Sequence, residues 1–356
     1  MFDFADVLLE VLRLKASDLH LTAGSPPMVR QKGRLNALDY PALTPQQTRE
    51  IIYSILTNDQ RKKLENDWQI DFAYSIPGQG RFRVNAYFQR ASLGAAFRLI
   101  PNDMPALDDL GLPPVLRDLT KKPRGFVLVT GPTGSGKSTT LAAMLDVINK
   151  ERHEHIMTIE DPIEFLHRHQ NCIVNQRELG SDAQSFGLGL KAALRQDPDV
   201  ILVGEMRDLE TIATALTAAE TGHLVFATLH TQDTAQTVDR IVDVFPPAQQ
   251  HQVRVQLSVS LQGIVTQQLL PTADGESRVC ATEILVPTPA VRNLIREGKT
   301  HQIYSALQTG GAHGMQTMDA ALVDLVRRNK ITRELAEARS SSPEELRRLM
   351  GTVRVA

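Results

Sequence analysis

Apolar and polar residues follow one set of patterns before residue 100 and another set after it. In the first part, short helical patterns are mixed with strict apolar–polar alternation, most clearly over residues 81–88. The elements predicted there are helices over residues 4–12, 44–55 and 58–65 and strands over residues 17–21, 70–76, 81–88 and 95–100. These patterns predict a small α+β domain over residues 1–100.

Proline- and glycine-rich segments follow and predict a linker over residues 101–115, before a second domain over residues 116–356. Strand-like runs alternate with helical patterns in that domain, over residues 126–130, 156–159, 200–203 and 224–228. Such alternation predicts an α/β fold with a mostly parallel sheet and a ligand at the carboxyl ends of its strands. After residue 247 we expect mainly helices and one hairpin-like pair over residues 264–270 and 279–286.

Length and composition fit a globular protein of two domains, because the chain has 356 residues, 42% of them hydrophobic and 22% charged. The net charge of −2 argues against a nucleic-acid partner. Cys172 and Cys280 give neither zinc spacing nor a disulfide framework, as expected in a reducing cytoplasm. No apolar run approaches transmembrane length, and the first 18 residues resemble neither a signal peptide nor an anchor.

The segment GPTGSGKSTT follows the strand-like run at 126–130 and matches the phosphate-loop pattern G-x-x-x-x-G-K-[ST] at every fixed position. Its glycines let backbone N–H groups turn toward phosphate oxygens, and Lys137 brings a cation to the β- and γ-phosphates. The Ser138 hydroxyl can bind Mg²⁺. The predicted nucleotide-binding residues are Gly131, Pro132, Thr133, Gly134, Ser135, Gly136, Lys137, Ser138 and Thr139. This segment predicts a site for ATP or GTP.

Acidic residues follow two further strand-like runs, where a nucleotide on the phosphate loop could be reached. Glu160, Asp161 and Glu164 lie close together, and a carboxylate there could deprotonate the attacking water. Glu205 lies just after the apolar run at 200–203, the position from which a carboxylate holds Mg²⁺ through water. An acidic loop in solvent is the alternative for the first group.

Two histidines flank the run at 224–228. His230 follows that run and could sense the γ-phosphate, whereas His223 precedes it and should lie at its opposite end. A zinc site is not expected, because no cysteine or third ligand is near. We expect the histidines at positions 153, 155, 167 and 169 to be solvated surface groups.

Arg81 and Arg83 point to the same side of the alternating strand over residues 81–88. They could be an ordinary exposed strand face. An ATPase whose phosphate loop lies at a subunit boundary needs arginines from outside its core, and these two can supply that charge.

A later segment, residues 288–299, predicts a short helix with Thr288 as N-cap. Its apolar residues share one face, while Arg292, Arg296 and Lys299 form a basic stripe that we expect to be solvated. The stripe could also couple hydrolysis to other machinery.

Taken together, ASDLHLTAGSPP, GRFRVN, GPTGSGKSTT, TIEDPIEF, RQDPDVILVGEMRD and TGHLVFATLHT resemble the secretion ATPases of type II secretion and type IV pili. The chain is most similar to the pilus retraction ATPases, the PilT family, over about residues 5–350. This resemblance implies a PAS-like N-terminal domain, a RecA-like ATPase domain, ATP as ligand and a cytoplasmic homohexamer. It also implies a partner, the platform protein of the inner membrane, and a location at the cytoplasmic face of that membrane.

The resemblance also assigns roles to individual residues. Glu164 would be the catalytic base and Glu205 the glutamate of an atypical Walker B motif. His223 and His230 would form the histidine box. Arg81 and Arg83, and with less weight Arg98, would be the N-terminal arginines that act on a neighbouring subunit.

Two features favour retraction over extension. Extension ATPases usually carry a four-cysteine zinc site and a longer N-terminal region, whereas this sequence has two cysteines. Residues 290–299 are similar to the retraction signature AIRNLIREGK, with Val291 in place of isoleucine. An accessory PilU-type paralogue, another secretion ATPase and a nucleic-acid translocase remain the alternatives.

Overall fold

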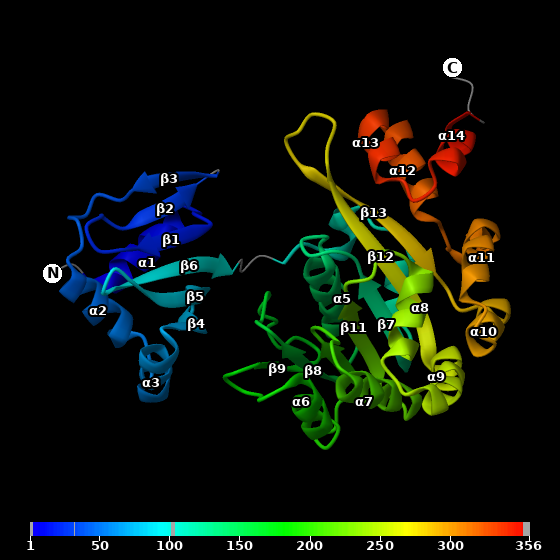
Figure 1. Cartoon of the computed structure of the whole chain (residues 1–356), viewed down its shortest axis with the longest axis horizontal. Coiled ribbons are helices and arrows are strands. Elements are labelled where there is room, and N and C mark those ends of the chain that lie inside the picture. Colours follow the sequence, from blue (N-terminus) through cyan, green and yellow to red (C-terminus); the bar gives the residue numbers. More distant parts are fainter. Residues whose placement is uncertain (1–2, 32, 101–103, 352–356) are drawn as a thin grey trace. The chain divides into compact units, whose positions relative to one another are not determined.

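The computed structural model describes residues 3–31, 33–100 and 104–351. The chain divides into two compact units, which we describe separately (Figure 1). The first contains the described residues up to Ile100 together with Glu164–Leu166, and the second contains Met104–Ile163 and the residues from His167 onward.

The first unit has a six-stranded antiparallel sheet with the strand order β3-β2-β1-β6-β5-β4. Its elements are α1 (Phe4–Arg13), β1 (Asp18–Leu21), β2 (Met28–Gln31), β3 (Arg34–Ala37), α2 (Pro45–Ser54), α3 (Asn58–Asp67), β4 (Gln69–Ile76), β5 (Gly80–Gln89) and β6 (Ser92–Ile100). The apolar side of α1 packs on the sheet, where the rings of Phe4 and Phe97 lie 5.4 Å apart. Alternation on β5 is as predicted: Phe82 and Val84 are buried, while Arg83 is exposed.

The second unit has a seven-stranded sheet with the order β13-β12-β7-β11-β10-β8-β9. Only the β12–β13 pair is antiparallel. Its elements up to the hairpin are η1 (Leu107–Leu110), α4 (Val115–Thr120), β7 (Gly125–Thr130), α5 (Lys137–Glu151), β8 (His155–Glu160), β9 (Ile173–Glu178), α6 (Phe186–Ala193), β10 (Val200–Val203), α7 (Leu209–Glu220), β11 (Leu224–Leu229), α8 (Thr234–Asp243), α9 (Pro247–Ser260), β12 (Leu261–Pro271) and β13 (Arg278–Leu285).

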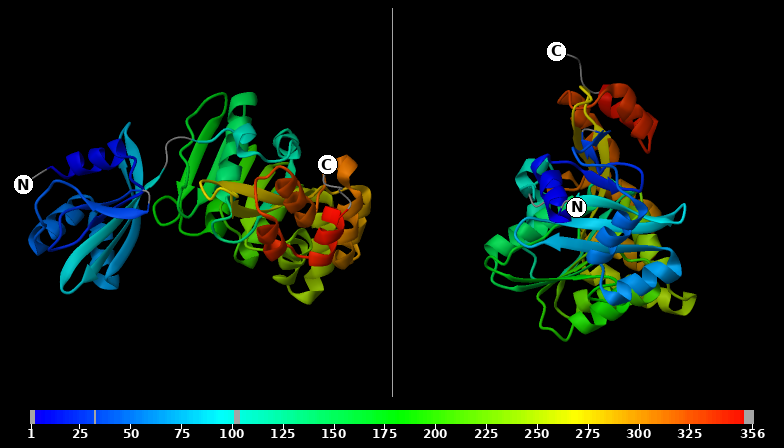
Figure 2. Two further views of the ribbon diagram at one scale, coloured as in Figure 1. Left: turned by 90° about the horizontal axis from the view of Figure 1, so that it is seen from above. Right: turned by 90° about the vertical axis from the view of Figure 1, so that its left-hand side faces the viewer.

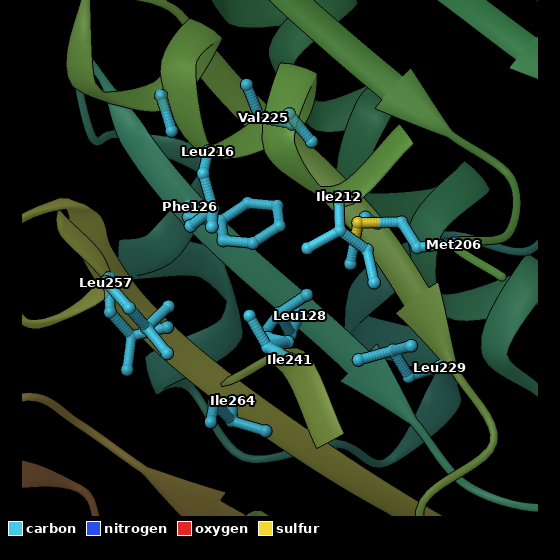
Figure 3. Packing of buried hydrophobic residues seen from close by; sticks show 14 of the residues in the cluster. Phe126, Leu128, Met206, Ile212, Leu216, Val225, Leu229, Ile241, Leu257 and Ile264 are labelled. Atoms are coloured by element: carbon cyan, nitrogen blue, oxygen red, sulfur yellow. The ribbon is translucent and has the colours of Figure 1, made fainter. Parts of the chain in front are cut away.

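Helices cover both faces of this sheet, as expected because its central strands are mainly apolar. Phe126 and Leu128 of β7 pack with Ile212, Ile241 and other residues of α7, α8 and α9 on one face (Figure 3). The alternate residues of β7, Val127 and Val129, face the other side of the sheet and pack against α5. The α/β fold class predicted from the sequence is confirmed.

The register of the parallel strands places their carboxyl ends at one edge. Thr130 of β7 pairs with Leu229 of β11, and Val203 of β10 pairs with Ala227 of β11 and Ile159 of β8. The segments that directly follow these strands therefore begin side by side.

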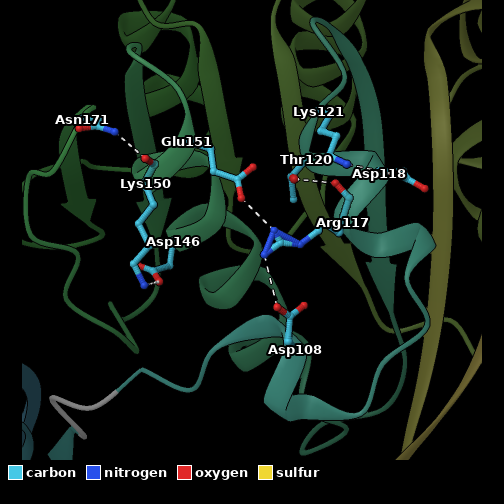
Figure 4. A network of polar contacts seen from close by, with 9 residues as sticks. All are labelled: Asp108, Arg117, Asp118, Thr120, Lys121, Asp146, Lys150, Glu151 and Asn171. Carbon is cyan, nitrogen blue, oxygen red and sulfur yellow. Dashed lines mark hydrogen bonds and ion pairs between the residues drawn. The ribbon is translucent and has the colours of Figure 1, made fainter.

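Part of the predicted linker is packed rather than extended. Residues 101–103 lie outside the described residues, but residues 104–115 contain η1 and the first residue of α4. Leu107 is buried against α5, and Arg117 joins Asp108 (3.4 Å) to Glu151 of α5 (2.8 Å; Figure 4). This segment therefore belongs physically to the second unit.

The C-terminal region is helical, as predicted. Its elements are α10 (Pro289–Arg296), η2 (Thr300–Gln302), α11 (Ile303–Thr309), η3 (Gly311–His313), α12 (Met318–Arg327), α13 (Arg333–Arg339) and α14 (Pro343–Gly351). Leu270 and Ala281 of the β12–β13 hairpin pack against α12–α14, which lie beside its outer end (Figures 1 and 2). Among the described helices, none combines the length and the apolar character needed to cross a membrane.

Candidate nucleotide site

The loop between β7 and α5 is built from glycines that no other residue could replace without strain. Gly131, Gly134 and Gly136 have φ values of 136°, 79° and 90°, in the region that favours glycine. A Cβ on Gly131 would lie 2.4 Å from the carbonyl oxygen of Gln267 and 2.7 Å from Oγ of Ser135. A Cβ on Gly134 or Gly136 would meet nothing within 4 Å, so the loop is open on that side.

The N-terminus of α5 is open to an anion. Its N-cap is Gly136, which provides no side-chain acceptor for the first N–H groups of the helix. Those N–H groups have no intrahelical partner and lie at the positive end of the helix dipole. Ser138 is exposed in this first turn. Loop and helix together form the anion-binding arrangement expected for a phosphate chain.

Lys137 is 9% exposed, and its ammonium group turns back onto the loop. Nζ donates hydrogen bonds to the carbonyl oxygens of Gly131 (2.8 Å) and Pro132 (3.0 Å). Burial lowers the pKa of Lys137, and the negative charge of Glu205 partly opposes that effect. A phosphate oxygen could replace the two carbonyls as acceptor of the Lys137 ammonium group.

Glu205 lies just after β10 and contacts Arg207 and His230. Its two carboxylate oxygens accept hydrogen bonds from Nε and Nη2 of Arg207, both at 2.6 Å, and Nε2 of His230 lies 3.0 Å from Oε1. The hydrogen bonds from Arg207, and to a smaller extent His230, lower the pKa of Glu205 although burial opposes them. The structure thus brings together Lys137, Glu205 and His230, as the sequence predicted for adjacent strand ends.

The oxygen donors at this edge suit Mg²⁺. A serine hydroxyl and a carboxylate are ligands that this hard cation prefers, and it commonly retains several waters. Arg207 occupies both oxygens of Glu205, so contact through water leaves the Arg207–Glu205 pair intact, whereas direct coordination would displace it. The residues present therefore fit a magnesium ion bound by Ser138 and, through water, by Glu205.

The acidic segment after β8 divides into two parts. Glu160 is 9% exposed and accepts hydrogen bonds from Thr158 (2.6 Å) and Gln176 of β9 (3.1 Å), so it joins β8 to β9. Asp161 and Glu164 are exposed. Glu164 lies in the short segment that groups with the first unit, and its role as base stays a prediction.

The histidines differ from one another more than their sequence suggests. His223 precedes β11, at the end opposite His230, and its Nδ1 lies 3.0 Å from the carbonyl oxygen of Ala218. Our expectation that His167 is a solvated surface group is wrong: its side chain is half-buried, and burial lowers its pKa to about 4. His153 is exposed, as expected.

The arginines of the first unit lie on neighbouring strands. Arg83 of β5 is opposite Arg98 of β6 and lies 4.0 Å from Asp71, while Nε of Arg98 donates to Asp18 at 2.9 Å. Arg81 is half-buried on the same side of β5 as Arg83. The pairing with Asp18 gives Arg98 a structural role within its own sheet. The roles of Arg81 and Arg83 toward a neighbouring subunit stay predictions.

Gln267 of β12 is a site residue that the sequence analysis missed. It is 1% exposed, its carbonyl oxygen lies against Gly131, and its Nε2 donates to Thr140 of α5 at 2.8 Å. One residue earlier, the hydroxyls of Thr266 and Thr130 are 2.8 Å apart. β12 thus supports the phosphate loop from behind. The clue in the sequence is the polar sequence Thr266-Gln267-Gln268 inside a mainly apolar strand.

A phosphate loop on the carboxyl edge of a parallel sheet, with Lys137, Glu205 and His230 beside it, defines a P-loop nucleotide-binding protein with a RecA-like core. The chain matches the model of the type II/IV secretion system protein family over residues 4–351. It belongs to that family, and the resemblance noted in the sequence is confirmed.

Several known proteins are similar over nearly the whole chain. The chain is 52% identical over 342 residues to the "Type IV pilus retractation ATPase PilT" of Pseudomonas aeruginosa, covering 96% of this chain and 99% of that relative. It is 43% identical to the "Type IV pilus ATPase PilU" of the same organism, covering 97% and 90%. A solved structure, "Crystal Structure of the Pilus Retraction Motor PilT and Bound ADP", superposes with a TM-score of 0.92 at 51% identity and covers 98% and 100%.

Proposed function

We propose that this chain is a motor ATPase that hydrolyses ATP to power type IV pilus retraction, and with it pilus disassembly and twitching motility. The observation that carries the proposal is the complete phosphate loop, including Lys137, together with the neighbouring pair of Glu205 and His230. The near full-length similarity to a protein named as a pilus retraction ATPase supports the biological role.

The proposed motor is a homohexameric ring. We place its N-terminal domain at residues 1–100 and its ATPase domain at residues 116–356, joined by residues 101–115, of which residues 104–115 group with the second unit. Arg81 and Arg83 of one subunit would approach the phosphates bound by its neighbour and neutralise charge that develops in the transition state. The exposed position of Arg83 and the separate N-terminal unit are compatible with action on another subunit.

In the proposed mechanism, the phosphate chain of ATP binds to the open N–H groups at the start of α5. Lys137 exchanges its two carbonyl acceptors for β- and γ-phosphate oxygens. Glu164 takes a proton from the attacking water, and His230 responds to the γ-phosphate while it contacts Glu205. Bound Mg²⁺, held by Ser138 and through water by Glu205, would supply positive charge to the phosphates.

The proposed partner is the platform protein of the inner membrane, with the ring at the cytoplasmic face of that membrane. The chain would associate peripherally, with no role for zinc or nucleic acid. The net charge of −2 supports the last point, because a nucleic-acid motor needs a basic surface.

The test is complementation of a strain that lacks its retraction ATPase. The wild-type chain should restore pilus retraction in live imaging, and Lys137→Ala, which removes the cation from the phosphate loop, should not. Failure of the wild-type chain to retract pili while purified protein hydrolyses ATP would contradict the pilus role.

The 43% identity to a PilU protein makes an accessory paralogue the second candidate. A chain of that type should complement loss of the accessory ATPase and not loss of the retraction ATPase itself. ATP hydrolysis that DNA stimulates, with a steep dependence on salt, would instead indicate a translocase.

A further inference from the structure

Glu283 of β13 is a buried carboxylate, 3% exposed, whose two oxygens accept hydrogen bonds from two different helices. Oε1 accepts from the backbone N–H and the hydroxyl of Thr234, at 2.8 and 2.9 Å. Oε2 accepts from the backbone N–H of Met318 at 3.3 Å. An unpaired buried carboxylate would be strongly destabilising, so these donors are what permit Glu283 to be buried.

Both donors stand at helix starts. Thr234 is the first residue of α8, and Met318 is the first residue of α12. Orphan N–H groups and the positive end of the helix dipole favour a carboxylate there. Each helix also has its own N-cap, Asp233 for α8 and Thr317 for α12. Glu283 therefore adds a connection between the two helices that neither needs for its own capping.

The start of α8 determines where His230 lies. β11 ends at Leu229, so only residues 230–233 separate it from Thr234. The hydroxyl of Thr231 lies 2.7 Å from that of Thr237, one turn into α8, which folds the short segment onto the helix. Further along α8, Asp239 accepts a hydrogen bond from Thr300 of η2 at 3.1 Å. Movement at the beginning of α8 would be transmitted directly to His230.

We propose that Glu283 is a positioning residue for ATP hydrolysis: it fixes the start of α8 so that His230 stays against Glu205, and it ties that position to the C-terminal helix α12. The proposal rests on the proposed ATPase function. Glu283 touches neither the phosphate loop nor Glu205 in the contacts described, and it acts through the backbone of α8. The C-terminal helices would thereby influence hydrolysis without reaching the nucleotide.

Glu283→Gln tests this connection with little change in shape. An amide oxygen can still accept the two hydrogen bonds from Thr234, but the amide nitrogen is a donor and faces the N–H of Met318. One of the two helix starts must therefore lose its partner. We expect kcat for ATP to fall about tenfold, because small displacements of catalytic groups have effects of at least that size. KM for ATP should stay within twofold, since the phosphate loop is untouched.

Two comparisons separate positioning from loss of stability. Arg152→Ala removes hydrogen bonds to the carbonyl oxygens of Thr120 (3.0 Å) and Lys122 (2.9 Å) and lowers stability away from both α8 and α12, so its kcat should be normal. In a His230→Ala background, Glu283→Gln should have little further effect, because its effect on kcat depends on the position of the His230 side chain. If Arg152→Ala lowers kcat equally, or if the effects of His230→Ala and Glu283→Gln multiply, the proposal is overturned.

The remaining outcomes are also decisive. Wild-type protein without ATP turnover would refute the proposed function itself, whereas an active wild type with an equally active, folded Glu283→Gln variant would refute only the positioning role. If Glu283→Gln does not fold, Thr234→Val removes one hydrogen bond to Oε1 and preserves shape. Its kcat should then fall severalfold at unchanged KM, and normal turnover of that variant would overturn the proposal.

Discussion

Nε2 of His230 lies 3.0 Å from Oε1 of Glu205, and this contact joins the ends of the adjacent strands β11 and β10. Because His230 contacts Glu205, and no hydrogen bond joins it to the phosphate loop among the residues that the structure describes, we expect His230→Ala to leave ATP binding intact. Its kcat should fall about tenfold, equivalent to about 1.4 kcal/mol of transition-state stabilisation. Steady-state kinetics measure kcat, and equilibrium binding measures the affinity for ATP. His153→Ala, at an exposed position, is the control. A matching loss of ATP affinity would contradict this role.

Glu164→Gln should bind ATP and fail to hydrolyse it. The amide keeps the size of the side chain but cannot accept a proton from water. Filter binding should detect trapped ATP, with the loss in kcat exceeding a hundredfold if Glu164 is the base. Glu205→Gln is the comparison, since it weakens the pairing with Arg207. Normal turnover by Glu164→Gln, with Glu205→Gln inactive, would reverse the roles we propose.

Arg83 and Lys137 are expected to work in different subunits of one site. Lys137→Ala and Arg83→Ala should each be inactive alone, whereas mixed rings should regain part of the activity. Mixing places an intact phosphate loop beside an intact arginine at some of the boundaries. The measurement is ATPase activity in hexamers whose mixed composition has been verified by mass spectrometry. Absence of recovery in such rings would count against a shared site.

Arg292 requires a correction to the predicted basic stripe. Its Nη1 donates to the carbonyl oxygens of Ser258 and Val259 (2.8 Å to the latter), at the C-terminus of α9, and burial lowers its pKa. Arg292→Ala should therefore destabilise the protein by about 1 kcal/mol, because the carbonyls of Ser258 and Val259, the first of them part-buried, lose a charged hydrogen-bond donor. Arg296 is exposed, and Arg296→Ala should change stability by less than about 0.5 kcal/mol. Thermal unfolding of the two variants checks the difference.

The coupling role considered for this segment now depends on Arg296 and Lys299, which are exposed. On that hypothesis, the variant with alanine at both positions forms rings and hydrolyses ATP but does not retract pili. Normal retraction would leave the segment with a structural role alone.

His167 should make stability depend on pH. Its pKa is about 4 in the folded protein against 6.5 for the ordinary side chain, because burial disfavours the charged form. As the pH falls, His167 therefore binds a proton at a higher pH in the unfolded chain than in the folded protein. The contribution of neutral His167 to the free energy of unfolding is complete above pH 6.5 and is lost as the pH falls toward 4, by up to about 3 kcal/mol. Thermal unfolding of His167→Gln should vary less over this range than that of wild type, with exposed His153→Gln as control.

Much of the fold follows from local patterns, and the differences arise where distant segments meet. The four central parallel strands are mainly apolar and were predicted. β3 has only four residues, all exposed, and β9 is partly polar, so neither was recognised as a strand. The hairpin was predicted, but not that β12 would insert beside β7, because strand order is a tertiary property.

The same distinction holds for the site. Lys137 was identifiable from the phosphate-loop motif, and Glu205 and His230 because each lies just after a strand-like run. Gln267 and Glu283 were not, because their partners lie far away in the chain and nothing local distinguishes a buried polar residue from an exposed one. The helical pattern predicted that Arg292 would be solvated, because such a pattern does not show that the C-terminal end of α9 lies beside this residue.

The insertion of β12 beside β7 affects how the second unit folds while the chain is being synthesised. β7 has β11 on one side and β12 on the other, and β12 also supports the phosphate loop through Thr266 and Gln267. On the ribosome, a nascent chain that ends before residue 261 leaves β7 as an open sheet edge, a known template for aggregation. The nucleotide pocket is thus completed only late in translation, although its phosphate loop emerges more than a hundred residues earlier.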